Sequence, residues 1–100
     1  MVKTLVANAA IPHIGQLVKV LRGKDENSYA VVIAIVDDKF VMIVDGNKRR
    51  FDQPKKKNVL HLELLPVISQ EVTSSLLETG RVTNAKLRYV IQKYTYSKGE

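Results

Sequence analysis

The sequence predicts a mainly β domain with C-terminal helices, in which a small five-stranded β-barrel precedes one or two α-helices. Residues 15–66 contain short apolar, β-branched segments that are separated by turn-forming residues. From residue 67 onward the apolar residues recur at helical spacing instead. A length of 100 residues is typical of one domain. We therefore expect an N-terminal arm (1–14), the barrel (15–66) and a helical extension (67–100).

Five segments of the barrel region have strand character. Residues 16–22 place Val18 and Val20 on one face of the first strand. Residues 28–36 are almost continuously apolar and β-branched, which is typical of a strand covered on both faces. The other predicted strands are residues 40–44, 48–51 and 59–65. Closure of these five strands into a barrel would remove the free sheet edges.

Acidic and glycine residues mark two of the turns between these strands. Asp37 and Asp38 fit a tight turn, because aspartate side chains bond to their own backbone there. Asp45 and Gly46 predict a hairpin leading into residues 48–51.

The last predicted strand alternates between apolar and polar residues. Its leucines are expected to point inward and the residues between them outward: Leu60, Leu62 and Leu64 against His61 and Glu63. Pro66 is expected to end this strand.

Two helices are predicted after the barrel. Ser69 can cap a helix over residues 70–79 that stops at Gly80, and Thr83 can cap a second helix over residues 84–94. The apolar stripes are Val72, Leu76 and Leu77 on the first helix, and Leu87, Val90, Ile91 and Tyr94 on the second. Lys86, Arg88 and Lys93 lie mostly off the second stripe.

Signals of enzymatic chemistry are scarce in this sequence. The chain has no cysteine, which excludes disulfides and thiolate sites and fits a reducing cytosol. The five glycines are too scattered for a phosphate-binding loop, and His13 and His61 lack metal-ligand spacing. No apolar run is long enough to span a membrane. We therefore expect a cytoplasmic protein that is not an enzyme and has no cofactor, metal site or membrane partner.

Positive charge is concentrated in one short segment. The chain carries a net charge of +6, and residues 48–57 hold six cations against the single acid Asp52. The cations are Lys48, Arg49, Arg50, Lys55, Lys56 and Lys57. The three lysines follow Pro54 in a predicted loop. A phosphate backbone would relieve their mutual repulsion, and we favour this interpretation over a solvated edge that only prevents aggregation.

Aromatic residues give little indication of base stacking. Tyr29 and Phe51 flank the basic segment, and packing is their expected role. Recognition of the backbone and shape of a structured RNA therefore fits this sequence better than single-strand readout.

Residues 15–65 resemble a KOW domain, an SH3-like barrel of ribosomal and transcription-elongation proteins. The resemblance is greatest to the large-subunit ribosomal family called fourteen-e and its short bacterial relatives. It includes Gly15-Gln16-Leu17-Val18, Gly23-Lys24-Asp25, Tyr29-Ala30-Val31-Val32, Val44-Asp45-Gly46, Arg49-Arg50, Pro54-Lys55-Lys56-Lys57-Asn58 and His61-Leu62. Asn27 stands where the family usually has glycine, and asparagine is the next best residue at a left-handed position.

This resemblance implies binding to ribosomal RNA through the first loop and the basic segment. The residues it adds as RNA contacts are Lys19, Arg22, Lys24, Asn58 and His61, beside Arg49, Arg50, Lys55, Lys56 and Lys57; the charged segment itself adds Lys48. The leading hypothesis is a non-enzymatic, ribosome-associated RNA-binding protein. The alternative is a protein-interaction module that docks through the barrel or through the apolar stripe of the C-terminal helix.

Overall fold

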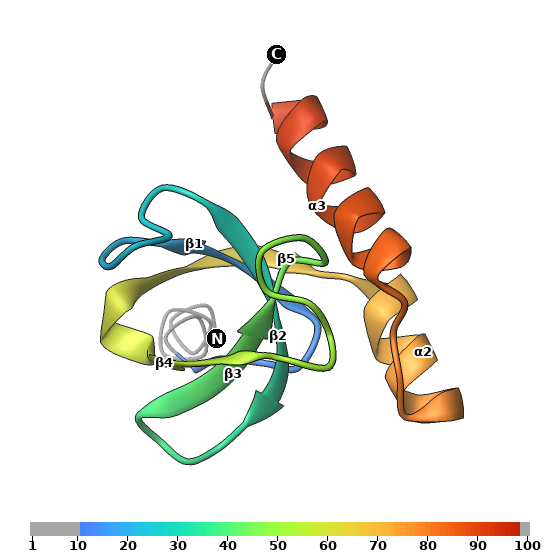
Figure 1. The fold of residues 1–100 in the computed structure, drawn as a ribbon, viewed down its shortest axis with the longest axis horizontal. Helices are drawn as coiled ribbons and strands as arrows, with labels where there is room; N and C mark the ends of the chain where they lie inside the picture. The colour runs from blue at the N-terminus through green and yellow to red at the C-terminus, as the bar shows by residue number, and fades with distance from the viewer. Residues whose placement is uncertain (1–10, 99–100) are drawn as a thin grey trace, which may run out of the picture.

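Five antiparallel strands and two C-terminal helices form the fold of the computed structural model, which describes residues 11–98 (Figure 1). The elements are β1 (Gln16–Val20), β2 (Tyr29–Ile35), β3 (Phe40–Val44), β4 (Lys55–Asn58), the 3₁₀ turn η1 (Val59–His61), β5 (Leu62–Ile68), α2 (Gln70–Thr79) and α3 (Asn84–Lys98). This confirms the mainly β class with C-terminal helices. Most of the predicted N-terminal arm lies outside the described residues.

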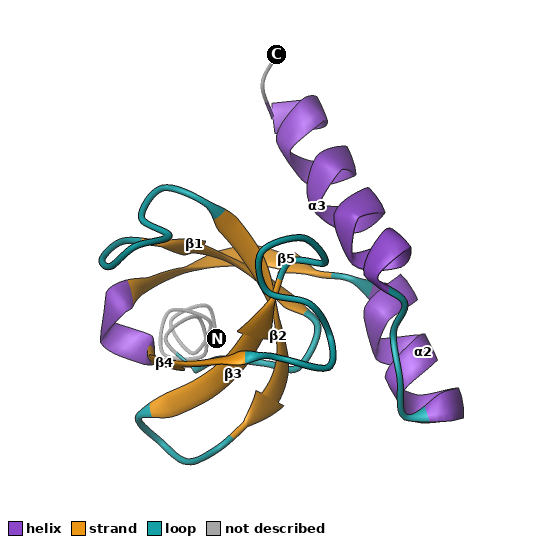
Figure 2. Cartoon of the chain, in the orientation of Figure 1, coloured by secondary structure: helices purple, strands orange, loops and turns teal. Residues whose placement is uncertain are grey.

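The strands form one curled sheet in the order β4-β3-β2-β1-β5. The arrangement fits a small SH3-like barrel, but the predicted closure was wrong, because in residues 11–98 β4 and β5 are the outer strands and do not pair with each other. The short turn η1 joins them instead (Figure 2). Two sheet edges therefore remain.

The two faces of the sheet bury separate apolar clusters. The cluster inside the curl consists of Val18, Val20, Ala30, Val32, Val41, Ile43 and Leu62. The cluster on the outer face joins the sheet to the helices and consists of Leu17, Val31, Val44, Leu65, Val72, Val82, Leu87 and Val90. Alternating side chains of β2 contribute to both clusters, which confirms the prediction of a strand covered on both faces.

Both helices pack on the outer face of the sheet (Figure 1). The Ser69 hydroxyl accepts from the Val72 N–H at 3.3 Å, and Gly80 ends α2 with a left-handed φ of 75°, which confirms both predicted caps. The predicted apolar stripe of α3 is confirmed, with Leu87 and Val90 fully buried. The predicted apolar stripe of α2 was wrong at Leu77, because this side chain is 87% exposed.

The strand predicted over residues 48–51 does not form. The N–H groups of Asp45 and Gly46 both donate to the Arg49 carbonyl, at 2.7 and 3.0 Å. The Asp45 carboxylate accepts from the N–H groups of Asn47 and Arg49, each at 2.8 Å. These bonds close residues 45–49 into a compact turn, and the returning strand begins only at Lys55.

The end of the predicted strand over 59–65 is also different in the structure. The Asn58 side chain caps η1 by accepting from the Leu60 N–H at 2.8 Å, and this turn leaves Leu60 84% exposed instead of buried. Pro66 does not end β5, which runs on to Ile68. Pro66 lies at a register shift between β1 and β5, where the Gln16 side chain donates to the Leu65 carbonyl at 2.8 Å.

Candidate functional site

The lysine run forms an edge strand and not the predicted loop. In β4, Lys55, Lys56 and Lys57 pair with Ile43, Met42 and Val41 of β3. Neighbouring residues of a strand point to opposite faces, so Lys55 and Lys57 share one face while Lys56 lies on the other. The three charges therefore spread around a sheet edge and do not share a single face.

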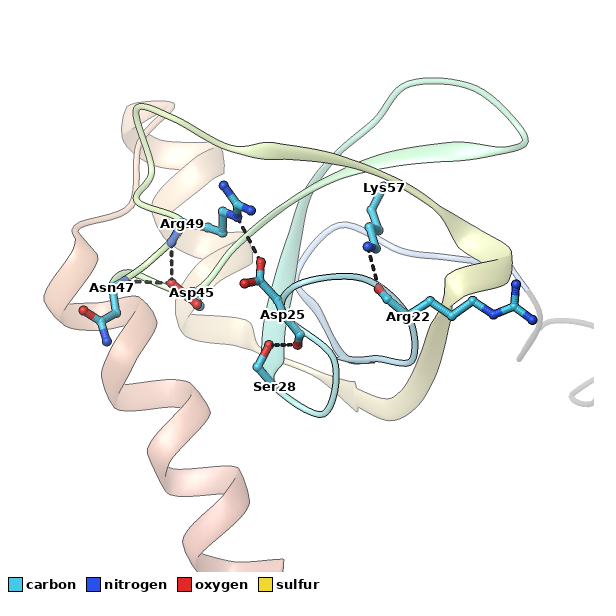
Figure 3. A network of polar contacts seen from close by, with 7 residues as sticks. All are labelled: Arg22, Asp25, Ser28, Asp45, Asn47, Arg49 and Lys57. Carbon is cyan, nitrogen blue, oxygen red and sulfur yellow. Dashed lines mark hydrogen bonds and ion pairs between the residues drawn. The ribbon is translucent and has the colours of Figure 1, made fainter.

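Lys57 ties β4 to the loop between β1 and β2. Its Nζ atom donates to the Arg22 carbonyl oxygen of that loop at 2.7 Å (Figure 3). A Cβ atom at Gly23 would lie 2.7 Å from this Nζ atom, so the contact uses the space that glycine leaves. Lys57 is half-buried, and its ammonium is engaged within the protein.

Arg49 makes a second tie to the same loop. Its Nε atom donates to the Asp25 carboxylate at 3.0 Å, in an ion pair whose side chains are 31% and 15% exposed. The Ser28 hydroxyl donates to the Asp25 carbonyl and holds the loop backbone (Figure 3). The β1–β2 loop is thereby fixed against both the 45–49 turn and β4.

Asn27 adopts the left-handed conformation that was expected where the resembled family has glycine. Its φ is 72°, and its N–H donates to the Val20 carbonyl at 2.7 Å. Asparagine is among the residues that tolerate this region best, so the loop keeps its shape without glycine.

Six other cations belong to the same β1–β2 loop, to the 45–49 turn and the residue after it, and to β4, and we call them the basic rim: Arg22, Lys24, Lys48, Arg50, Lys55 and Lys56. All six are exposed. Within residues 11–98 none of their side chains forms a hydrogen bond or ion pair, and Lys56 lies over the Phe40 ring at 4.7 Å. Figure 3 shows the Arg22 side chain pointing away from the network. The rim therefore presents positive charge that forms no ion pair within the described chain, although the charge of Lys56 acts on the Asp37 carboxylate and helps to lower its pKa.

Three residues from the predicted set face their own chain instead of joining the rim. Lys19 is half-buried, with its Nζ atom 5.9 Å from the centre of the Tyr29 ring. Asn58 caps η1 through its side chain. His61 is half-buried at the end of η1, and its carbonyl accepts from the Leu21 N–H at 2.8 Å.

Two structural residues of the site were missed in the sequence. Asp25 forms an ion pair with Arg49, which is 24 residues away in the sequence. A pair separated by this distance produces no local sequence pattern from which it could be predicted. Arg88 of α3 donates from Nη1 to the Gly46 carbonyl at 2.7 Å. Close packing of the 45–49 turn on α3 requires Gly46, because a Cβ atom there would lie 2.4 Å from the Asn84 carbonyl oxygen.

Tyr29 and Phe51 pack against the outer cluster, as predicted. The Tyr29 ring meets the Tyr94 ring edge-on, with centroids 6.0 Å apart. Neither aromatic side chain is therefore a free platform beside the rim.

The acidic groups have structural roles. Asp37 accepts from the backbone N–H groups of Lys39 and Phe40, which lower the pKa of its carboxyl, and the charge of Lys56 adds to this effect. The predicted turn at Asp37 is confirmed. Among residues 11–98 no three His, Asp or Glu side chains gather as a metal site would require. No helix in the described part of the chain has both the length and the apolar character needed to cross a bilayer.

Comparison with known proteins gives two relatives. The chain is 48% identical over 71 residues to the "Putative ribosome-binding protein YbzG" of Bacillus subtilis (strain 168), an alignment that covers 71% of this chain and 96% of the relative. It is 32% identical over 80 residues to the "Large ribosomal subunit protein eL14" of Hyperthermus butylicus, covering 67% of this chain and 76% of the relative. No family model matches the chain.

Proposed function

The chain belongs to the eL14-like family, as a relative of the short bacterial type, and from this we propose that it is a ribosome-associated, non-enzymatic protein that binds ribosomal RNA through the basic rim. The two relatives carry the names of a ribosome-binding protein and of a large-subunit ribosomal protein. These names support association with the ribosome, and the rim suggests ribosomal RNA as the component that is bound.

The observation that carries the proposal is that the rim cations stand on a fixed backbone without an ion pair in the described residues. Lys55 and Lys56 belong to a strand that is hydrogen-bonded to β3. Lys24 and Arg22 lie in a loop tied down by Lys57 and Arg49. Because the backbone is fixed, only side-chain freedom is lost when these cations meet phosphates, and the contact releases condensed counterions.

The rim suits recognition of the RNA backbone more than of base identity. Tyr29 and Phe51 pack against the outer cluster, and the Phe40 ring lies under Lys56. Lysines act as point charges on phosphate oxygens, whereas the two rim arginines, Arg22 and Arg50, offer bidentate donors. Structured RNA recognised by its shape and phosphate positions is the class of ligand that fits best.

Among the cations predicted to contact RNA, Lys57 and Arg49 have a structural role. Both cations bond to the β1–β2 loop, so we assign them to positioning that loop and not to direct RNA contact. This refines the set of RNA contacts expected from the sequence.

The test compares two variants with the same loss of charge. Lys55→Gln/Lys56→Gln removes two positive charges from the rim, and Ser74→Glu/Leu77→Glu adds two negative charges on exposed positions of α2. Affinity for purified large-subunit ribosomal RNA is measured by filter binding at fixed salt. We expect the rim variant to bind about tenfold more weakly or worse, and the α2 variant to stay much closer to wild type.

Equal losses in the two variants would mean that net charge alone sets the affinity, and would refute the rim as a site. Circular dichroism of both variants checks that the fold is unchanged. Docking of a protein partner remains the alternative function. It cannot use the predicted stripe of α3, because Leu87 and Val90 are buried against the sheet.

A further inference from the structure

Helix α3 is the second basic element of the molecule. Its residues 84–98 include Lys86, Arg88, Lys93 and Lys98 and not one Asp or Glu. Two of these cations lie at opposite borders of its outer face: Arg88 contacts the 45–49 turn, and Lys93 pairs with Glu71 of α2 at 3.0 Å. Arg88 keeps its full charge, because its acceptor is a neutral carbonyl, whereas Lys93 is paired with Glu71 and lies over the Tyr89 ring, 5.2 Å from its centroid. The outer face is therefore bordered by cations on both sides.

Two tyrosines stand exposed on this outer face. Tyr89 is 53% and Tyr96 is 81% exposed, and they are seven residues apart, which places them two turns apart on one side of the helix. Gln92 lies between them and is also exposed. We call Tyr89, Gln92 and Tyr96 the tyrosine ridge. The apolar residues Leu87 and Val90 occupy the opposite, buried side.

The tyrosine ridge is adjacent to the basic segment. Arg88 and Gln92 line one depression together with Asp45 and Asn47 of the turn before Lys48. Figure 3 shows Asn47 beside α3. This depression therefore lies between the turn that precedes Lys48 and the Gln92 position of the ridge.

We infer that the tyrosine ridge is a second RNA contact, at which unpaired bases of the RNA bound by the rim stack on Tyr89 and Tyr96. The inference rests on the proposed function and extends it from phosphate contacts to bases. Exposed aromatic rings bordered by cationic side chains are what single-stranded RNA segments stack on. Tyrosine is also common in protein interfaces, so the experiment uses protein-free RNA to separate the two kinds of partner.

The experiment replaces both tyrosines in the full chain. Tyr89→Ala/Tyr96→Ala removes the rings, Tyr89→Phe/Tyr96→Phe keeps them, and Leu77→Ala, which removes an exposed apolar side chain of α2, is the control outside the ridge. Affinity is measured for protein-free large-subunit ribosomal RNA over a salt series. We expect the alanine pair to weaken binding about tenfold or more, as for the loss of one or two stacked bases. The phenylalanine pair and Leu77→Ala should bind close to wild type, and the salt dependence should not change, since no charge is removed.

Three results would overturn the inference. The alanine pair could bind protein-free RNA as the wild type does. It could lose affinity for whole large subunits alone, in which case the ridge contacts a ribosomal protein. The phenylalanine pair could lose as much as the alanine pair, which would exclude ring stacking. Failure of the proposed function has a different signature: the wild type would not bind protein-free RNA, or Lys55→Gln/Lys56→Gln would bind it unchanged.

Discussion

The two outer strands of the sheet, β4 and β5, protect their free edges in different ways. β5 is apolar, contributes Leu62 and Leu65 to the two buried clusters, and carries Pro66 at its register shift. β4 contributes no residue to the buried part of either cluster, and three of its four residues are lysines. Proline with an irregular register and lysine charge are both recognised ways to prevent edge-to-edge pairing. Only the lysine edge also offers binding sites for an anion.

This comparison shows why the basic segment had two interpretations from sequence. A lysine-rich edge strand prevents aggregation whether or not it binds RNA, so its position alone does not decide between them. The loop ties made by Lys57 and Arg49 go beyond what edge protection needs, because they fix Arg22 and Lys24 beside the edge.

The largest effect on stability is expected on the β5 side. Leu65→Ala empties a buried position of the outer cluster and should lower the free energy of unfolding by about 2–5 kcal/mol, measured by urea denaturation. Lys55→Gln/Lys56→Gln on β4 should change it by about 0.5 kcal/mol or less, because both side chains are exposed. A comparable decrease in the free energy of unfolding for Lys55→Gln/Lys56→Gln would mean that these two side chains contribute substantially to the stability of the sheet.

Loop positioning is tested by Asp25→Asn. The variant raises the net positive charge by one yet removes the ion pair that holds Arg49. We expect affinity for ribosomal RNA to fall a few-fold, because the β1–β2 loop loses one of its two ties. Lys48→Gln serves as the comparison, since it lowers the charge without touching the loop. Tighter binding by Asp25→Asn would show that total charge outweighs loop geometry.

The smallest effect on stability is expected when the pH is lowered and the ion pair between Glu71 of α2 and Lys93 of α3 is lost. A hydrogen bond from Lys93 holds the pKa of Glu71 below its ordinary value of 4.5. A depressed pKa in the folded state means that Glu71 adds stability above its unfolded pKa and loses it as pH falls through the folded value. Between about pH 6 and about pH 3, the Tm of Glu71→Gln should therefore fall slightly less than that of the wild type. An identical fall in both proteins would show that the pair has no effect on stability.

Local patterns were sufficient to predict much of the fold. The caps at Ser69 and Gly80 and the left-handed Asn27 each depend on the chemistry of one or two neighbouring residues. The alternation of Val18 and Val20 placed them correctly inside the curl. These features could be predicted because their causes lie within a few residues.

The errors arose where a distant partner or a side-chain cap changed the backbone. Lysine has low strand propensity, yet pairing with β3 makes residues 55–58 a strand. Apolar and polar residues alternate around Leu60, which predicted a strand. The Asn58 side chain instead caps a 3₁₀ turn that contains Leu60. Asn58 was a readable signal for this turn, since asparagine favours cap positions. The role of Asp25 could not be predicted, because its partner is 24 residues away.

The central claim, that the β4 edge meets RNA phosphates, is tested most directly by the salt dependence of binding. The observed affinity for protein-free large-subunit ribosomal RNA is measured across a salt series for the wild type and for Lys55→Gln/Lys56→Gln. If both lysines contact phosphates, the slope of log affinity against log salt becomes shallower by about two in the variant. An unchanged slope would contradict the account, since it would show that neither lysine releases counterions on binding.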